Sequence, residues 1–446
     1  MLGRTLRLLS LPAGALVLAA EGRLRTLAGA DHERVRTELR ARNTERTRRV
    51  LGELKGGALK AGQLLSTVEA LFPSDPSATW RETLTGLQQD NPALPFSDIE
   101  PVLVQELGPR WPTLFSSFDP VAAAAASIGQ VHRAIWADGR PVAVKVQYPG
   151  VREALESDVR AVSVLSRATA LVARGLALPP LVAELRERLL EELDYLHEAA
   201  AQRRFALAYD ADPRFVVPAV VQATPRVLVQ QWLDGTPLAR VAELGSQAER
   251  DRAAELYQLF LVSGPERAGL LHTDPHPGNF RITADGRLGV LDFGSTLRLP
   301  DGMPPTFGRL IAALLSGDEA AVLIRLREDG FLDPDRTLEV GKLIDYMAPF
   351  SEPARHERFT FSRAWLRGEF GRVNDPRNPD FGVALQLRMP SKHLFTHRVW
   401  LGMVGVLCQL EATVPVRPVL NRWLPGFAAA ASPAHGVDHL TAEEPA

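Results

Sequence analysis

The sequence predicts an α+β fold with two lobes, a small antiparallel β-sheet lobe and a large helical lobe, preceded by a helical extension. Short apolar runs of period two, joined by Asp-Gly turns, gather in residues 111–235. Segments of helical length, separated by Pro and Gly, occupy residues 1–110 and 236–427. Residues 428–446 are rich in Ala, Pro and Glu, and we expect them to form a disordered tail.

Composition excludes several classes of function. The 446 residues are 46% hydrophobic and 23% charged, as in an ordinary globular protein. A net charge of -2 gives no global basic field that would indicate nucleic-acid binding. The single cysteine, Cys408, excludes a disulfide framework and lies in an apolar stretch, which favours a core role over a nucleophilic one. No apolar run reaches the ~18 residues expected of a membrane span.

The predicted extension carries three features. Residues 8–20 are mostly apolar and follow two arginines, which fits a short signal peptide or a helix lying on a surface. Residues 34–49 are rich in arginine, and this segment is either a solvated helical face or a surface that attracts anionic lipid. In Lys60-Ala-Gly-Gln63, the spacing of Lys60 and Gln63 places both on one helix face.

The small lobe should begin with a helix and three strands. Ser97 and Glu100 predict a capping box for a helix that ends near Leu107. The three strands are expected at residues 114–118, 128–135 and 142–148. The first two are joined by a loop that contains Ala122, Ala123, Ala124, Ala125, Ala126 and Ser127.

A lysine lies inside the third apolar strand. Burying Lys145 is costly unless it meets an anion, although an edge-strand lysine pointing to water is the simpler alternative. The next long helix, expected over residues 181–208, offers Glu192 and Glu198. These two acids lie on different helix faces, so at most one of them can contact Lys145 directly.

Two further strands, at residues 216–222 and 226–232, would complete a five-stranded lobe. The backbone from Gln230 to Leu233 would then form a connector with free amide and carbonyl groups. A helix over residues 247–264 follows and begins the large lobe.

The stretch from His272 to Gly294 brings together polar groups that could act chemically. Two short apolar runs flank Asp285-Gly286 and predict a hairpin that returns Asp292 to the side of Asn279. With Asp274 they offer oxygen ligands that suit a divalent cation, and phosphate oxygens would complete its coordination shell. The spacing is that of a phosphoryl-transfer catalytic loop. A plain turn, or a metallohydrolase using His272, Asp274 and His276, are the alternatives.

Only about ten residues separate Gly294 from the next predicted helix, at residues 306–316. A protein kinase needs a longer activation segment there, with an anchor motif, to hold a peptide. The short segment favours a small or lipid-like substrate, or none.

Together these motifs resemble the UbiB/AarF family of atypical, protein-kinase-like proteins, from about Lys60 to Gly294. They are Lys60-Ala-Gly-Gln63, the alanine-rich stretch from Ala122 to Gln130, Val142-Ala-Val-Lys145, Glu192-Leu-Asp194, His272-Thr-Asp-Pro-His-Pro-Gly-Asn279 and Asp292-Phe-Gly294. The alanine run is longer than the three that are usual in the family. Gln231 stands where the family often has Glu.

The resemblance implies a protein-kinase-like fold that binds ATP and Mg²⁺. Lys145 would hold the α- and β-phosphates, Asn279 and Asp292 the metal, and Asp274 would occupy the position of the catalytic base. The remaining cofactor contacts would come from the alanine-rich loop and the connector, namely Ala124, Ala125, Ala126, Ser127, Gln231 and Leu233. Regulatory roles would fall to Lys60, Gln63, Glu192, Asp194 and Glu198.

The expected function is that of a kinase-like ATPase acting on, or regulated by, an isoprenoid or quinone lipid. Its expected partners are ATP, such a lipid and an anionic membrane surface, with no nucleic acid; a homodimer stays open. The expected location is cytoplasmic, at the inner face of a membrane. Two alternatives remain: an ATP-switched lipid chaperone or scaffold without phosphotransfer, and a small-molecule phosphotransferase.

Overall fold

The computed structural model describes residues 93–126, 128–157, 160, 193–335, 339–374, 383 and 386–428, with residues 21, 25, 38, 39 and 42. Residues 8–20, Lys60, Gln63, Ser127, Glu192 and residues 429–446 lie outside this description. The chain divides into two compact units. The first combines residues 1–241, 272–297 and 391–403, and the second combines residues 242–271, 298–390 and 404–446.

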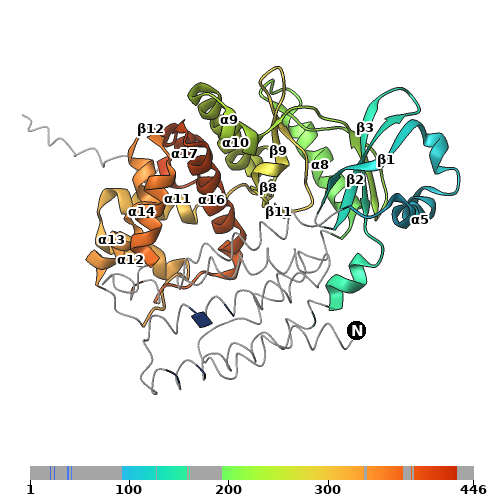
Figure 1. Ribbon diagram of the computed structural model, residues 1–446. Coiled ribbons are helices and arrows are strands. Elements are labelled where there is room, and N and C mark those ends of the chain that lie inside the picture. The colour runs from blue at the N-terminus through green and yellow to red at the C-terminus, as the bar shows by residue number, and fades with distance from the viewer. Residues whose placement is uncertain are drawn as a thin grey trace, which may run out of the picture. The chain divides into compact units, whose positions relative to one another are not determined.

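The first unit is built around a five-stranded antiparallel sheet in the order β1-β2-β3-β6-β5. Figure 1 labels three of these strands, β1, β2 and β3. Its five strands and antiparallel pairing agree with the predicted small lobe, for which no strand order was predicted. The strands are β1 (Phe115–Ala125), β2 (Gly129–Trp136), β3 (Pro141–Gln147), β5 (Val220–Ala223) and β6 (Val227–Gln231).

The alanine run departs from its prediction as a loop, because β1 continues through it to Ala125. Ala122 pairs with His132 and Ala125 pairs with Gln130, with irregular register between them. The turn is tight, since the Ala126 N–H donates to the Gly129 carbonyl over 2.8 Å. Alanine is a weak strand former, so the run by itself did not indicate a strand. The partner strand β2 overrides that preference.

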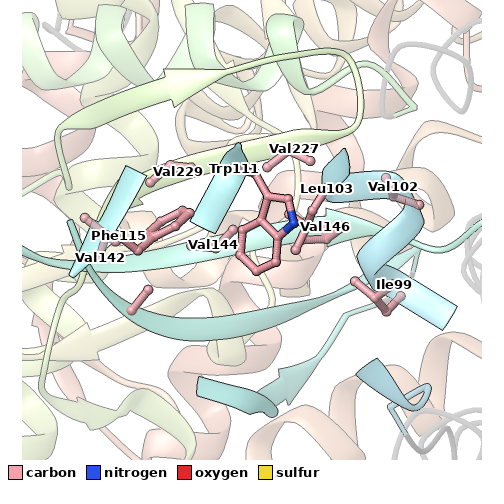
Figure 2. Packing of buried hydrophobic residues seen from close by; sticks show 11 residues of the cluster. Ile99, Val102, Leu103, Trp111, Phe115, Val142, Val144, Val146, Val227 and Val229 are labelled. Atoms are coloured by element: carbon pink, nitrogen blue, oxygen red, sulfur yellow. The ribbon is translucent and has the colours of Figure 1, made fainter. Parts of the chain in front are cut away.

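The side chains of β3 alternate between the two faces of the sheet. Val142, Val144 and Val146 are fully buried and pack against the helix α5 (Phe96–Leu107) and the ring of Trp111, which lies in η1 (Trp111–Leu114) (Figure 2). The alternate residues, including Lys145, face the opposite side. The same strand therefore supplies both the apolar core and the polar site.

The start of α5 differs from the prediction. Its N-cap is Pro95, which has no capping side chain, so the expected capping box of Ser97 and Glu100 does not form. The reason is a tertiary contact: the buried Gln130 amide bonds both the N–H and the carbonyl of Leu94, at 2.8 and 3.2 Å. This contact fixes the chain just before Phe96, where the helix begins.

The polar face of the sheet is covered by α8 (Tyr195–Tyr209), whose N-cap Asp194 accepts from the Leu196 N–H over 3.0 Å. A second sheet of this unit has the order β4-β10-β9-β7. Its central pair is the predicted hairpin, with Leu288 opposite Ile282 and Val290 opposite Phe280. Its strands are β4 (Phe215–Val216), β7 (Thr236–Pro237), β9 (Phe280–Ile282) and β10 (Leu288–Val290), and η2 (Pro277–Asn279) precedes β9.

The second unit is mainly helical. Its long helix α10 (Gln247–Ala268) begins with a capping box of Ser246 and Glu249 and ends at Gly269. One apolar core joins α11 (Thr306–Ser316), α12 (Glu319–Glu328) and α13 (Val340–Ser351). Its other elements are η3 (Glu352–Arg355), β12 (Arg358–Thr360), α14 (Arg363–Asn374), β13 (Thr413–Pro415) and α17 (Arg417–Trp423).

Four elements contain a boundary between the units: β8 (Leu270–His272), α9 (Leu238–Leu244), β11 (Thr296–Arg298) and α16 (Ser391–Leu410). Cys408 of α16 is buried, and burial raises the pKa of its thiol to about 12, in keeping with the predicted core role. Within the described part of the chain, no helix combines the length and apolarity that crossing a membrane requires.

Candidate nucleotide site

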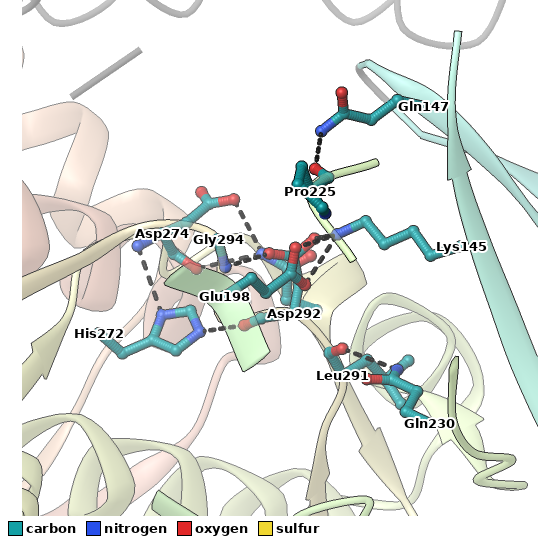
Figure 3. A network of polar contacts seen from close by, with 11 residues as sticks. Lys145, Gln147, Glu198, Pro225, Gln230, His272, Asp274, Leu291, Asp292 and Gly294 are labelled. Carbon is teal, nitrogen blue, oxygen red and sulfur yellow. Dashed lines mark hydrogen bonds and ion pairs between the residues drawn. The ribbon is translucent and has the colours of Figure 1, made fainter. Parts of the chain in front are cut away.

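A buried lysine lies at the centre of the site. The Lys145 ammonium donates to both carboxylate oxygens of Glu198, at 2.8 and 2.9 Å, and to Asp292 Oδ2 at 2.9 Å (Figure 3). Lys145 is 9% exposed and Glu198 is 3% exposed, so this is a largely dry ion cluster. Of the two predicted partners, the structure assigns Glu198, and Glu192 lies outside the described residues.

Burial and charge oppose each other in this cluster. Burial raises the pKa of Glu198 to about 6, even with Lys145 beside it. Burial also disfavours a charged lysine, but Asp292 and Glu198 outweigh it, and the pKa of Lys145 lies well above its usual value. The ammonium is therefore a permanent positive charge at this point, held by two acids of different exposure.

The ring of Tyr195 forms another wall around the lysine. Its centroid lies 5.1 Å from the Lys145 ammonium, within the range of a cation–π contact. Tyr195 is the first residue of α8, one helical turn before Glu198, so one helix end places both groups against the lysine. The Tyr195 hydroxyl is buried and has no hydrogen-bond partner among the described residues.

The loop before β9 orders two of the predicted residues. Asn279 Nδ2 donates to Asp274 Oδ2 at 2.8 Å. Because the amide nitrogen is engaged there, the amide oxygen of Asn279 is the atom that would bind a metal. The Leu291 N–H donates to the Asn279 carbonyl at 2.9 Å, so the hairpin returns the chain beside Asn279, as predicted. Asp292 is the next residue.

His272 supports this arrangement from below. Its Nδ1 accepts from the Asp274 N–H at 3.3 Å, so its Nε2 must carry the proton that it donates to the Asp292 carbonyl at 2.7 Å. Burial lowers the pKa of His272, which favours this neutral form. Because both ring nitrogens bond the backbone, His272 acts as a brace and not as the metal ligand of the metallohydrolase alternative.

Two glycines permit close approach within the site. A Cβ at Gly129 would lie 2.2 Å from the Val146 carbonyl oxygen, so β2 can reach β3 here only without a side chain. A Cβ at Gly294 would lie 3.2 Å from Asp292 Oδ1 and 3.4 Å from Glu198 Oε2. The Gly294 N–H also donates to Asp292 Oδ1 at 2.9 Å, which fixes that carboxylate.

The other predicted cofactor residues lie along the same sheet. Ala124 and Ala125 are in β1, Ala126 is in the turn, and Gln231 ends β6. The Gln231 N–H is bonded to the Ala219 carbonyl at 2.8 Å, so that amide is not free as the connector prediction assumed. The Leu233 side chain lies over Gly289 of β10.

The profile of the ABC1 atypical kinase-like domain matches residues 86–325, more than half of the chain. The chain belongs to the UbiB/AarF (ABC1) family of atypical kinase-like proteins. Its fold is thus the predicted α+β, protein-kinase-like fold. Lys145, Asp274, Asn279 and Asp292 all lie within the matched segment.

Individual relatives agree with this family. The chain is 32% identical over 383 residues to "Atypical kinase COQ8, mitochondrial" of Saccharomyces cerevisiae, covering 83% of this chain and 74% of that one. It is 35% identical over 286 residues to "Protein ACTIVITY OF BC1 COMPLEX KINASE 1, chloroplastic" of Arabidopsis thaliana, covering 60% of this chain and 39% of that one. The chain thus spans well under half of that plant relative.

A solved structure is also similar over nearly the whole chain. It is the complex of Rv3197 from Mycobacterium tuberculosis with erythromycin, with a TM-score of 0.68 and 38% sequence identity. The match covers 90% of this chain and all of that one.

Sequence reasoning did not identify Tyr195 or the side chain of Gln230 as neighbours of the site, nor the bracing role of His272. For Gln230 a signal existed. Val227 and Val229 alternate with Leu228 and Gln230, so the amide shares the face of Lys145 by period two. Nothing in the sequence indicated that Tyr195 would lie against the lysine.

Proposed function

We propose that this UbiB/AarF-family chain binds ATP with Mg²⁺ and hydrolyses it or transfers its γ-phosphate. The observation that carries the proposal is the buried Lys145 ammonium, paired at once with Glu198 and with Asp292. A purely structural ion pair would need only one acid. Here Lys145 has a second acid, Asp292, whose side chain is 36% exposed. An exposed carboxylate beside a buried ammonium suits the polar end of a nucleotide.

The residues present fit a magnesium ion. Asn279 and Asp292 would offer an amide oxygen and a carboxylate, a hard-oxygen donor set that phosphate oxygens would complete. The ion would supply neutralisation of the charge that develops on the transferred phosphoryl group. Lys145 would bind the α- and β-phosphates, and Glu198 would hold its ammonium in place.

Asp274 would take the position of the catalytic base. The Asn279 amide holds its Oδ2 at 2.8 Å and the His272 ring holds its backbone N–H, so the carboxylate is oriented before any substrate arrives. Such preorganisation is what phosphoryl transfer asks of a protein. Asp274 would orient an attacking water or hydroxyl and accept its proton.

A lipid is the acceptor or regulator that fits best. The described chain passes from Gly294 to the start of α11 at Thr306 with one short strand between, so this segment offers little to bind a peptide. An isoprenoid or quinone lipid at an anionic membrane surface is consistent with this and with the family. Liposomes that stimulate phosphate release would support this part. Equal turnover with and without liposomes would oppose it.

The central test replaces Asp292 with Asn and measures Mg²⁺-dependent ATP binding by calorimetry. We expect binding to be lost, because the change removes the carboxylate that would hold the metal. Asp285→Asn is the matched control, since Asp285 lies in the exposed turn of the same hairpin. Unchanged affinity and magnesium dependence in the Asp292 variant would mean that the metal site is wrongly assigned.

A turnover assay separates an enzyme from an ATP-switched scaffold. Asp274→Asn should bind ATP with little change and release phosphate at least ~100-fold more slowly, the scale of a lost general base. If wild type and variant release phosphate at the same rate under every lipid condition, the scaffold alternative is favoured.

Erythromycin is a second candidate ligand, favoured by the 38% identical Mycobacterium tuberculosis protein whose solved complex contains it. Calorimetry of the full chain with erythromycin, with and without ATP, tests it. Binding that survives Asp292→Asn would place the macrolide apart from the metal residues, and no heat at all would remove this candidate.

A further inference from the structure

Gln230 of β6 is a buried polar residue that the roles above leave unused. It is 7% exposed, and its Nε2 donates to the Leu291 carbonyl over 3.2 Å (Figure 3). Its amide oxygen has no donor among the described residues. Because a carbonyl can only accept, the Leu291 contact fixes the amide with nitrogen toward Leu291 and oxygen away from it.

The Leu291 peptide is itself firmly placed. Its N–H donates to the Asn279 carbonyl at 2.9 Å, while its carbonyl accepts from Gln230. The amide of Gln230 is therefore anchored to the backbone between the two proposed metal residues, Asn279 and Asp292. Turning the amide over would set its oxygen against the Leu291 carbonyl, so the buried atom on the far side from Leu291 stays an acceptor.

Gln230 lies on the same face of the sheet as the lysine. It pairs with Ala143, whereas Lys145 pairs with Leu228 on the same strand. It is thus displaced from Lys145 by about 7 Å along the strands and about 5 Å across them. Its cross-strand neighbour Ala143 carries only a methyl group on this face.

The opposite direction along the sheet is filled. Gln147 is 1% exposed, and its amide nitrogen donates to the carbonyls of Leu193 and Pro225, at 2.9 and 3.3 Å. Leu228 is fully buried in the core cluster that contains Tyr195. A nucleotide with its phosphates at Lys145 would therefore extend along the strands toward Ala143 and Gln230.

We propose that Gln230 is a specificity-determining residue whose amide oxygen accepts a hydrogen bond from the exocyclic amino group of adenine. The proposal rests on the ATP binding proposed above and deepens it. A 6-keto purine presents an acceptor where adenine presents a donor, so two acceptors would meet at Gln230. A site built to bond one group rejects an analogue that leaves its buried partner unpaired.

The test compares binding of ATP and ITP, which differ in the 6-amino and 6-keto groups, to the full chain with Mg²⁺. We expect the wild type to bind ATP about tenfold more tightly, the scale of one hydrogen bond. Gln230→Met should reduce this preference to within about twofold. The control Gln222→Met, on the neighbouring strand β5, should keep it. A preference that survives in Gln230→Met would overturn the proposal.

A second measurement needs no variant. Purine riboside triphosphate has hydrogen at position 6, so it offers no donor and adds no bulk. We expect the wild type to bind it more weakly than ATP by about fivefold. Equal affinity would overturn the role of Gln230 while leaving ATP binding intact. Absence of binding by all three nucleotides would instead end the proposed function and this inference together.

Discussion

The two faces of the five-stranded sheet use the same strands in opposite ways. On one face, Val142, Val144 and Val146 pack with α5 and Trp111 in a dry apolar layer. On the other, the Lys145 ammonium is held by hydrogen bonds to the carboxylates of Glu198 and Asp292. Apolar packing is non-directional and tolerates similar shapes, whereas a buried charge depends on each partner. Mutations on the two faces should therefore differ in kind as well as in size.

The largest effect is expected where a charge loses its partner. Lys145→Met leaves Glu198 buried and uncompensated, and we expect unfolding in urea to show a loss of about 3 kcal/mol. The double variant with Glu198→Leu should recover most of that stability, because both buried charges are then gone, without recovering ATP binding. A single variant as stable as the wild type would show that this cluster is far better hydrated than its burial indicates.

Gly129 tests how closely β2 and β3 must approach on the polar face. Gly129→Ala places a methyl group against the Val146 carbonyl, and we expect a loss of roughly 2–3 kcal/mol in the free energy of unfolding. Gly341→Ala in α13 is the control, because no atom lies within 4 Å of its added Cβ. The control should be stabilised slightly, as alanine favours a helix. Equal melting temperatures for the two variants would contradict the close contact.

On the apolar face, Val144→Ala should cost about 2 kcal/mol through lost burial and a small cavity. Its ATP affinity should stay within about twofold of the wild type, because the removed atoms point away from the site. Chemical unfolding and calorimetry on the same preparation check both statements. A large loss of affinity would mean that the two faces are more strongly coupled than the alternation of β3 suggests.

Gln130 is a polar exception on the apolar face. Gln130→Glu keeps an acceptor for the Leu94 N–H but loses the amide donor to the Leu94 carbonyl and to His132 Nε2. We therefore expect a loss of roughly 1–2 kcal/mol. Hydrogen exchange should become faster in residues 94–103. Unchanged protection there would show that α5 is held by its apolar face alone.

The smallest effect concerns pH. Burial lowers the pKa of His132 on the apolar face and of His272 under the site. The unfolded chain therefore binds more protons near and below 6.5, and stability should fall as pH decreases from about 6.5.

Glu198 opposes this trend below its pKa of about 6, since its folded pKa is raised and its protonation favours the folded state. Urea midpoints at several pH values measure the sum. His132→Gln should flatten the curve, and an unaltered slope would remove His132 from the account.

Local patterns predicted much of the fold, because their causes lie within a few residues. Asp285-Gly286 specified the hairpin of β9 and β10, and the segment after Gly294 led to a helix at Thr306, as expected. The start of α5 could not be predicted, because Gln130, far along the chain, holds Leu94. Ala122 to Ala125 form a strand only because β2 pairs with them.

The structure brings Lys145 and Asp292 together, but only part of the contacts around them could be predicted. Spacing placed Asn279 and Asp292 together, since a hairpin has a fixed register. The choice of Glu198 over Glu192 depends on where α8 begins, and Asp194 sets that point as its N-cap. Gln230 contacts Leu291, and Tyr195 contacts Lys145. Both contacts depend on segments that are far apart in the sequence, so local patterns could not predict them.

The first unit is assembled from three separated stretches of chain, ending with residues 391–403. During synthesis on a ribosome, at ~5–20 residues per second, the strands and α8 emerge seconds before Asp292 does. In that interval the nascent sheet holds Lys145 and Glu198 without the second acid. Gly402, against which Pro275 of the loop before β9 rests, arrives later still. The loop that carries Asp274 and Asn279 is therefore among the last parts of this unit to acquire its neighbours.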